Sequence, residues 1–352
     1  MVKTEIMSSI RIAQFGCGYW GPHLMRNLFA HPAVEVAGLV DTNDKVRDWL
    51  AGHYPELPFS TNTTMKQLEE WGAQAVVLAT PAGTHFDLAS QVLESGRHCL
   101  VEKPLAMTSG ECRQLIDLAT RAGVILMVGH TFLFNPVVRE LKTIIQAGNL
   151  GEIYYAHAQR LNLGRVRKDI DAVWNLAPHD ISILLYLFGQ MPSRVSARGA
   201  SYIQPGIADV AFLDLEFPDG KYASIQVSWL DPQKVRRLTV VGSQQMAVYD
   251  DVAENKLVIY DKGVDRAHPE KATLGSYEDF GTFQLRLRAG GMQIPQIDFV
   301  EPLKMEIAEF VEAIFQNRKP LTDGANGLQT VQVLEAATRS MALEGTFVSV
   351  ER

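Results

Sequence analysis

The sequence predicts an α/β protein of two domains: a doubly wound parallel sheet over residues 1–128, and an α+β domain with a large, open and mainly antiparallel sheet over residues 129–352. Three observations predict this architecture. A chain of 352 residues is long for a single core. Short apolar runs alternate with helical patterns up to residue 128. Segments of alternating polarity dominate the later part of the chain.

The expected strands of the first domain are short apolar runs bounded by Gly, Pro or polar residues, as buried parallel strands are. They cover residues 10–16, 34–41, 75–80, 98–104 and 124–130. Helical patterns lie between them at 23–31, 44–52, 84–96 and 109–123, and each ends near Gly or His. Repetition of strand, helix and strand predicts a parallel sheet with right-handed crossovers.

The pattern changes after residue 135. Helices are expected at 135–148, 175–189, 302–317 and 327–345. Strands are expected at 154–164, 194–203, 209–217, 222–230, 237–243, 245–251 and 256–261. Many of these strands alternate polar and apolar residues, which predicts an antiparallel sheet with one face covered.

The composition excludes several classes of protein. A net charge of −7, without a long cluster of Lys and Arg, argues against nucleic-acid binding. The three cysteines show neither CxxC pairing nor metal-ligand spacing, so we expect no metal and a reducing compartment. The start of the chain lacks a signal-peptide core, and its longest apolar run, at 181–189, is too short for a membrane span. We therefore expect a cytoplasmic protein.

The segment GCGYWG matches the G-x-G-x-x-G fingerprint of Rossmann dinucleotide-binding domains. It follows a strand, opens a helix, and is followed at the end of the second strand by Asp41. Gly16 permits the tight turn, Gly18 the approach of the pyrophosphate, and Gly21 close helix packing. Asp41 would bind the ribose hydroxyls and repel a 2′-phosphate, so the predicted cofactor is NAD. The alternative is a glycine-rich turn with a surface aspartate.

Two further strand ends are expected beside the cofactor, because ligands bind at the carboxyl ends of parallel strands. One carries TPAGTHFD and the other EKP; His85 could instead only start a helix, and the lysine of EKP could form a lone ion pair. With the turn itself, these ends complete the expected cofactor-binding set: Gly16, Gly18, Tyr19, Trp20, Gly21, Asp41, Thr80, Pro81, His85, Glu102 and Lys103.

The motifs GCGYWG, ATPAGTH, VEKPLA, VGHTFLFNP and WNLAPHD together resemble the Gfo/Idh/MocA oxidoreductases over nearly the whole chain. The resemblance implies that Lys103 lies near the nicotinamide and the substrate, and that His179 transfers a proton. Many members have aspartate four residues before this histidine, where this chain has Asn175. An amide cannot act as a general base, so Asn175 is expected to position the substrate or His179.

A structural alternative exists for Asn175. Asn is a favoured N-cap residue, and Pro178 would then lie in the first helical turn, where proline is tolerated. Both roles can hold together. Asp180 is expected to favour the helix start electrostatically and not to act as a base.

The segments around these motifs look most like the nucleotide-sugar branch of the family, such as UDP-N-acetylglucosamine 3-dehydrogenases. This likeness implies oxidation of a sugar hydroxyl to a ketone, with His179 as base and Lys103 stabilising the alkoxide. Three arginines, Arg160, Arg165 and Arg167, could bind the diphosphate, although the basic run around the last two could also be a solvated loop. His130 and Asn135 could line the sugar pocket or close a domain junction.

The residues leave other functions open. A dehydrogenase of a free sugar or inositol, or a 3-keto sugar reductase, would use the same groups. A non-enzymatic NAD-dependent sensor would need only the cofactor motif. The family is commonly oligomeric, and an open sheet face favours pairing, so a homo-oligomer, dimer or tetramer, is expected.

Overall fold

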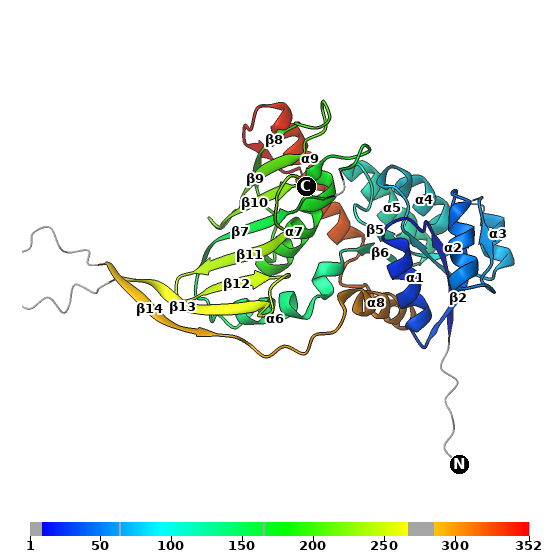
Figure 1. The fold of residues 1–352 in the computed structure, drawn as a ribbon, viewed down its shortest axis with the longest axis horizontal. Helices are drawn as coiled ribbons and strands as arrows, with labels where there is room; N and C mark the ends of the chain where they lie inside the picture. Colours follow the sequence, from blue (N-terminus) through cyan, green and yellow to red (C-terminus); the bar gives the residue numbers. More distant parts are fainter. Residues whose placement is uncertain (1–8, 63–64, 165, 267–284, 352) are drawn as a thin grey trace, which may run out of the picture. The chain divides into compact units, whose positions relative to one another are not determined.

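The computed structural model describes residues 9–62, 65–164, 166–266 and 285–351, and its internal contacts divide the chain into two compact units (Figure 1). Unit 1 contains the chain up to Asn135, Val300–Thr338 and the C-terminal end; unit 2 contains Pro136–Phe299 and Arg339–Ser349. This division differs from the expected boundary after residue 128. The difference arises because a C-terminal helix packs its apolar face into the core of the N-terminal sheet.

Unit 1 is built on a six-stranded parallel sheet with the order β3-β2-β1-β4-β5-β6. This order confirms the predicted doubly wound sheet. It reverses between β1 and β4, which is where such sheets bind ligands. The two-residue β3 was not expected. The strands are β1 (Ile10–Phe15), β2 (Val34–Val40), β3 (Phe59–Ser60), β4 (Ala75–Leu78), β5 (His98–Glu102) and β6 (Leu126–Gly129).

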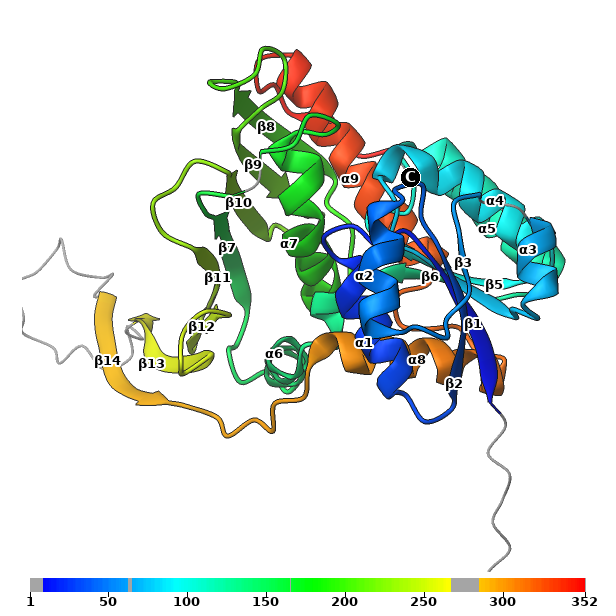
Figure 2. The same cartoon turned by 45° about the vertical axis from the view of Figure 1, so that its right-hand side comes forward.

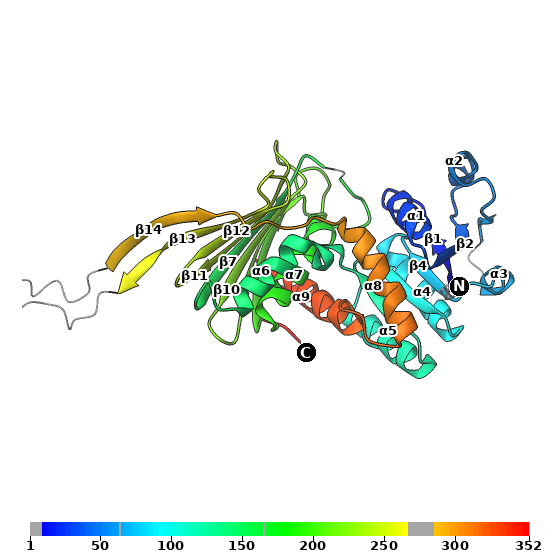
Figure 3. The ribbon, with the colours of Figure 1, turned by 90° about the horizontal axis from the view of Figure 1, so that it is seen from below.

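Helices cover both faces of this sheet. Figure 3 shows α1 on one side of β1 and β4, with α4 and α5 on the other. Alternate strand residues such as Ile12 and Val77 share a buried cluster with Leu24 of α1 and Ile307 of α8, so α1 and α8 pack on the same face. The helices are α1 (Gly21–Ala30), α2 (Lys45–His53), α3 (Met65–Glu70), α4 (His85–Glu94), α5 (Ser109–Ala122), α8 (Pro302–Gln316) and the first part of α9 (Gly324–Ala342), with 3₁₀ turns η1 (Ala82–Thr84) and η2 (Thr131–Phe134).

The tight turn after β1 depends on glycine. Gly16 has φ +88°, in the left-handed region, and a Cβ there would lie 2.5 Å from the carbonyl oxygen of Ala79. The Gly16 amide also donates to the carbonyl of Val40 at 2.7 Å. The ends of β1, β2 and β4 can therefore meet only if residue 16 lacks a side chain.

Unit 2 is built on a nine-stranded sheet, which is antiparallel except for the parallel pair β7 and β10 (Figure 1). It confirms the predicted second sheet and adds β14 and β15. Its order is β14-β13-β12-β11-β7-β10-β9-β8-β15. The strands are β7 (Ile153–Leu161), β8 (Arg194–Ala200), β9 (Val210–Glu216), β10 (Tyr222–Ser228), β11 (Val235–Gly242), β12 (Met246–Asp250), β13 (Leu257–Arg266), β14 (Leu285–Gln293) and β15 (Val348–Ser349).

One face of this sheet is covered by helices α6 (Pro136–Gln146) and α7 (Ala172–Phe188). Figure 2 shows α7 lying along β7, β9 and β10. On β7 the covered residues Ala156 and Ala158 are fully buried, whereas His157 and Gln159, which alternate with them, are less so. None of the helices in the described ranges has both the length and the apolar composition needed to cross a membrane.

A buried ion pair ties α7 to the sheet. Arg160 of β7 donates from Nε and Nη2 to the two carboxylate oxygens of Asp180 on α7, at 2.8 and 2.9 Å. Both side chains are at most 7% exposed. Asp180 was expected only to favour the helix start; this interpretation is wrong, because the carboxylate is turned inward onto a strand that lies 20 residues earlier.

We expect Gly16→Ala to lower the free energy of unfolding by at least about 2 kcal/mol, because the new Cβ meets a left-handed backbone and the Ala79 carbonyl. Gly52→Ala, in α2 with open space around it, is the matched control and should stabilise by about 0.5–1 kcal/mol. Urea unfolding of both variants measures the difference. Equal stability of the two variants would contradict the argument.

Asp180→Asn should cost about 3–5 kcal/mol, because it leaves the Arg160 charge buried without a counter-ion. The exposed pair of Arg194 and Glu216 provides a control: Glu216→Gln should cost less than about 1 kcal/mol. Chemical denaturation of both proteins tests this contrast, and a loss of similar size in each would show that burial of the first pair is unimportant.

Candidate active site

The glycines of the GCGYWG turn differ in what surrounds them. A Cβ on Gly21 would lie 2.8 Å from the carbonyl oxygen of Gly16, so this position requires glycine for helix packing. Gly18 has no atom of the described residues within 4 Å of its missing Cβ. The protein itself thus places no packing demand on Gly18, and the open space beside its backbone suits the close approach of a ligand.

The N-terminus of α1 is not capped by a side chain. Its N-cap residue, Trp20, makes no side-chain capping bond, and the first turn contains no acidic residue. Pro22 in this turn is preset for the helix and has no N–H to satisfy. Tyr19 before it is 78% exposed. The positive end of the helix is therefore available to a phosphate group.

Asp41, just after β2, is held by main-chain amides. Its Oδ2 accepts from the Cys17 amide at 2.7 Å and its Oδ1 from the Asn43 amide at 2.8 Å. The carboxylate is thereby joined to the glycine-rich turn. Burial, and then the charge of Asp41, raise the pKa of the Cys17 thiol to about 12, so the thiol stays neutral there. An open helix N-terminus beside a fixed carboxylate fits a dinucleotide with a free ribose 2′-hydroxyl.

His85 joins two of the expected strand ends. Its Nδ1 lies 2.7 Å from the carbonyl oxygen of Pro104, and its Nε2 lies 3.0 Å from that of Thr80. The side chain is 1% exposed. Thr84 Oγ1 completes the turn: it lies 2.8 Å from the carbonyl oxygen of Pro81, to which it can donate, and 2.8 Å from Thr80 Oγ1, from which it can accept. These contacts indicate that His85 stabilises the turn that carries Thr80 and Pro81 by linking it to Pro104.

Glu102 is the last residue of β5, and Lys103 follows it. The Lys103 amide donates to Glu102 Oε2 at 3.2 Å, and the next peptide bond, to Pro104, is cis. Burial raises the pKa of Glu102 to about 7, while Lys103 and a hydrogen bond from the Trp20 side chain lower it. The EKP lysine therefore has a carboxyl neighbour that is linked in turn to the glycine-rich loop.

His130 and Asn135 are both 1% exposed, which supports their structural alternative. His130 Nδ1 lies 2.7 Å from Asn326 Oδ1, and burial lowers the pKa of His130 to about 4, so the imidazole is neutral. The sequence reasoning missed Glu306 of α8, a fully buried carboxyl group. A signal existed, because Glu306 is spaced three residues after Leu303 and four before Phe310, on the apolar stripe of its helix.

Helix α7 begins earlier than expected, and this overturns the N-cap interpretation of Asn175. The N-cap is Asp171, whose side chain accepts from the Trp174 amide at 2.9 Å, and Pro178 lies inside the helix. Asn175 and His179 are therefore four residues apart within one regular helix and share a face. Both are partly exposed, whereas Pro178 and Asp180 are buried.

Asn175 has a partner that the sequence did not indicate. The indole Nε1 of the buried Trp229 donates to Asn175 Oδ1 at 3.2 Å. Because the amide oxygen faces the indole, the amide nitrogen points away from it. Trp229 follows β10, 54 residues later, so only the fold could reveal this pair.

The three arginines expected at a diphosphate have different positions. Arg160 is 5% exposed and engages Asp180, as described above. Arg167 pairs with Asp169 through Nε and Nη2, at 2.9 and 2.5 Å. Arg165 lies outside the described residues. Of these side chains, Arg167 is the one that the structure places at the surface, where 34% of it is exposed.

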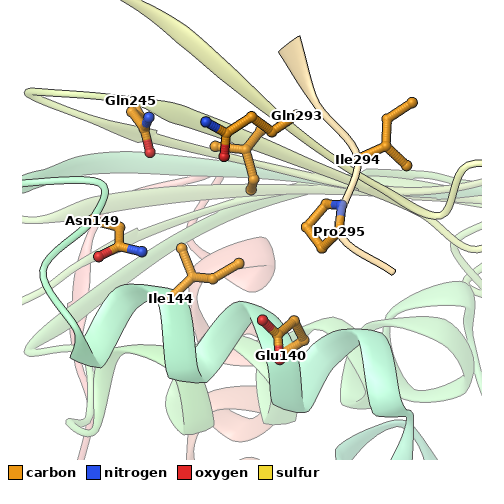
Figure 4. A pocket seen from close by; sticks show the side chains of 8 residues that line it. Glu140, Ile144, Asn149, Gln245, Gln293, Ile294 and Pro295 are labelled. Atoms are coloured by element: carbon orange, nitrogen blue, oxygen red, sulfur yellow. The ribbon is translucent and has the colours of Figure 1, made fainter. Parts of the chain in front are cut away.

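Unit 2 also contains a cavity of about 290 Å³ beside α6 (Figure 4). It holds none of the expected site residues, so we do not place the reaction there. Its lining is Glu140, Ile144, Asn149, Gln245, Ile259, Gln293, Ile294 and Pro295.

Comparison with known proteins assigns both parts of the chain to domains of the same family. Residues 10–130 match the oxidoreductase family with an NAD-binding Rossmann fold, and residues 138–248 match the GFO/IDH/MocA C-terminal domain. The chain is 29% identical over 72% of its length to a UDP-N-acetylglucosamine 3-dehydrogenase from Acidithiobacillus ferrooxidans, covering 74% of that protein. A crystal structure of this enzyme superposes with a TM-score of 0.78 at 25% identity, over 96% of this chain and 99% of that one.

A second relative is named for a different substrate, an inositol. The chain is 25% identical over 94% of its length to a scyllo-inositol 2-dehydrogenase (NAD⁺) from Bacillus subtilis, of which it covers 94%. The two family models together span most of the chain, and the fold and the glycine-rich turn agree with them. The chain therefore belongs to the Gfo/Idh/MocA family of NAD-dependent oxidoreductases.

Proposed function

We propose that the protein oxidises a hydroxyl group of a nucleotide sugar to a ketone, with C3 of a UDP-N-acetylglucosamine-type sugar as the favoured position. The observation that carries this proposal is the similarity to the UDP-N-acetylglucosamine 3-dehydrogenase of A. ferrooxidans, in sequence and in fold. The inositol dehydrogenase relative supports a free polyol as the competing substrate.

The chemistry requires removal of a hydride from the carbon and of a proton from its hydroxyl group. NAD supplies the hydride acceptor. His179 takes the hydroxyl proton, since the ordinary pKa of imidazole is close to neutral pH. Lys103 donates a charge-assisted hydrogen bond to the alkoxide oxygen. The two side chains belong to different units, so the proposal requires them to meet at the nicotinamide ring in the working enzyme.

Asn175 serves as a positioning group in this proposal. Its oxygen accepts from Trp229, and it shares a helix face with His179. The amide nitrogen is then a donor directed at the substrate or at the imidazole. The ion pair of Asp180 with Arg160 helps to fix this face, because it holds α7 against the sheet at the residue directly after His179.

The diphosphate of the substrate requires cationic or main-chain donors. We propose Arg167 for this contact, and Arg165 beside it in the chain, because a guanidinium fork suits phosphate oxygens. Arg167 would exchange its present partner, Asp169, for the diphosphate. The fork of Arg160 faces Asp180 and takes the supporting role instead.

A homo-oligomer that pairs through the uncovered face of the unit 2 sheet is part of the same proposal. Large aromatic side chains lie on this face: Tyr155, Phe212 and Tyr222 are 45%, 53% and 37% exposed. In-register pairing places Tyr155 next to Tyr222 on neighbouring strands. Burying such a patch against a second copy would stabilise the assembly.

The cofactor preference can be tested at Asp41. Asp41→Asn keeps an acceptor for the Cys17 amide but removes the charge, so it should weaken the discrimination against NADP by at least tenfold. Fluorescence titration with NADH and NADPH measures the ratio of the two Kd values. An unchanged ratio of the two Kd values would mean that a group other than Asp41 discriminates between the ribose 2′-hydroxyl and the 2′-phosphate.

Catalysis can be tested with the purified protein, NAD and three candidate substrates: UDP-N-acetylglucosamine, scyllo-inositol and glucose. We expect NADH formation with the nucleotide sugar, and a fall in kcat of about 10²- to 10⁴-fold in His179→Ala, because the base is lost. Lys103→Met should also lower kcat, because it removes the donor to the alkoxide.

His53→Ala is the control for these variants, because His53 lies exposed at the end of α2, outside the expected site residues and the proposed pairing face, and its Nδ1 contacts the carbonyl oxygen of Trp49. It should retain the wild-type rate. Turnover of inositol in place of the nucleotide sugar would assign the competing substrate. Full activity of both the His179 and Lys103 variants would refute the catalytic assignment.

A further inference from the structure

A second carboxyl group lies close to the EKP motif in unit 1. Glu306 of α8 is 0% exposed, and its Oε2 accepts a hydrogen bond from Thr131 Oγ1 at 2.6 Å. Its other oxygen, Oε1, is buried and has no hydrogen-bond partner among the residues that the structure describes. A buried ionised carboxylate with one oxygen unsatisfied is costly, so the geometry favours a protonated Glu306.

The backbone brings Glu102 toward the same place. Glu102 of β5 pairs in register with Gly129 of β6, two residues before Thr131. A Cβ on residue 129 would lie 3.0 Å from Glu102 Cδ and 3.1 Å from both carboxylate oxygens, so glycine makes room for the carboxyl group. Thr131 then holds Glu306 against the same strand end.

The nearby charges cannot neutralise two carboxylates. His130, between Gly129 and Thr131, is neutral as described above. Arg26 of the neighbouring helix α1 is engaged by Glu301. Asn326 of α9 carries no charge and binds His130. Within the described part of the chain, Lys103 is the cation whose charge lowers the pKa of Glu102.

The two acids influence each other. Burial, and then the charge of Glu102, raise the pKa of Glu306 well above its ordinary value. Glu102 retains partial exposure, whereas Glu306 has none, so the neutral form is favoured more strongly at Glu306. Because a negative charge on Glu102 disfavours ionisation of the fully buried Glu306, the two groups titrate as one unit.

We propose that Glu102 and Glu306 share one proton at neutral pH, and that Glu306 in this way sets the negative charge beside the Lys103 ammonium. Glu306 is thus a positioning residue that acts through Glu102. One negative charge balances Lys103 at neutral pH, and a second appears only when the shared proton leaves at higher pH. The effect on Lys103 chemistry rests on the proposed function, whereas the shared proton does not.

Infrared spectroscopy of the full chain at pH 7 tests the shared proton directly. The wild type should show the carbonyl band of a protonated carboxyl group, with a shift in D₂O. Glu306→Gln should lose this band, because the single remaining acid ionises. Glu309→Gln is the matched control on the same helix, since Glu309 is paired with Arg318, and it should keep the band. A wild type without the band, or a Glu306→Gln variant that keeps it, overturns the proposal.

Unfolding as a function of pH gives a second measurement. A raised pKa in the folded state means that the folded protein binds more protons than the unfolded chain above the ordinary Glu value of 4.5. The wild type should therefore lose stability relative to Glu306→Gln as pH rises, by up to about tenfold in the folding constant per pH unit. If Glu306→Gln fails to fold, Thr131→Val replaces it: loss of the hydrogen bond to Oε2 should shift the infrared band. An unshifted band there, or parallel stability curves, would contradict the assignment.

Activity separates this inference from the proposed function. If the protein turns over the nucleotide sugar, Glu306→Gln should move the alkaline limb of kcat/KM to lower pH while the KM for NAD stays constant, because the second negative charge beside Lys103 is absent. If the alkaline limb of kcat/KM stayed at the same pH in Glu306→Gln, Glu306 would have no effect on the protonation of Lys103. A wild type that binds NAD without turnover would instead refute the proposed function, and the infrared band would still report the shared proton.

Discussion

The close approach of the Gly16 main chain to Ala79 is the constraint on which the nucleotide-binding unit depends. It allows the ends of β1, β2 and β4 to meet where the strand order reverses. The amide of Cys17 then reaches Asp41, and the N-terminus of α1 opens without a side-chain cap. A single backbone requirement thus orders the phosphate and ribose ends of the cofactor site together.

Buried charge is the second organising feature, and it lies next to each proposed catalytic side chain. In unit 2 the Arg160–Asp180 pair anchors the helix that carries His179. In unit 1 the Glu102 carboxyl group lies beside Lys103, and its charge acts on the buried Glu306. Such groups contribute little to net stability when their desolvation is counted, but they fix orientation and charge. In each unit a buried carboxyl group therefore lies on or beside the segment that carries a proposed catalytic residue.

The WNLAPHD segment shows how local and tertiary reasoning diverge. Asn and Pro are both favoured near helix starts, so capping was a reasonable expectation for Asn175. The helix instead starts at Ala172, because Asp171 caps it and the apolar run after His179 packs on the sheet. Asn175 then lies inside the helix and does not cap it, and its side chain is fixed by the indole of Trp229, which follows β10.

Hydrophobic period, glycine requirements and motif spacing are local, and the sequence alone therefore determined the two sheets, the family, the cofactor and the positions of most helices. It could not place β14, whose paired glycines weaken the strand pattern, or assign α8 to the first unit. Nor could it find the partners of Asp180, Asn175 and Glu306. Those partners lie 20, 54 and 175 residues away, and only the packing of distant strands and helices decides which buried polar groups meet.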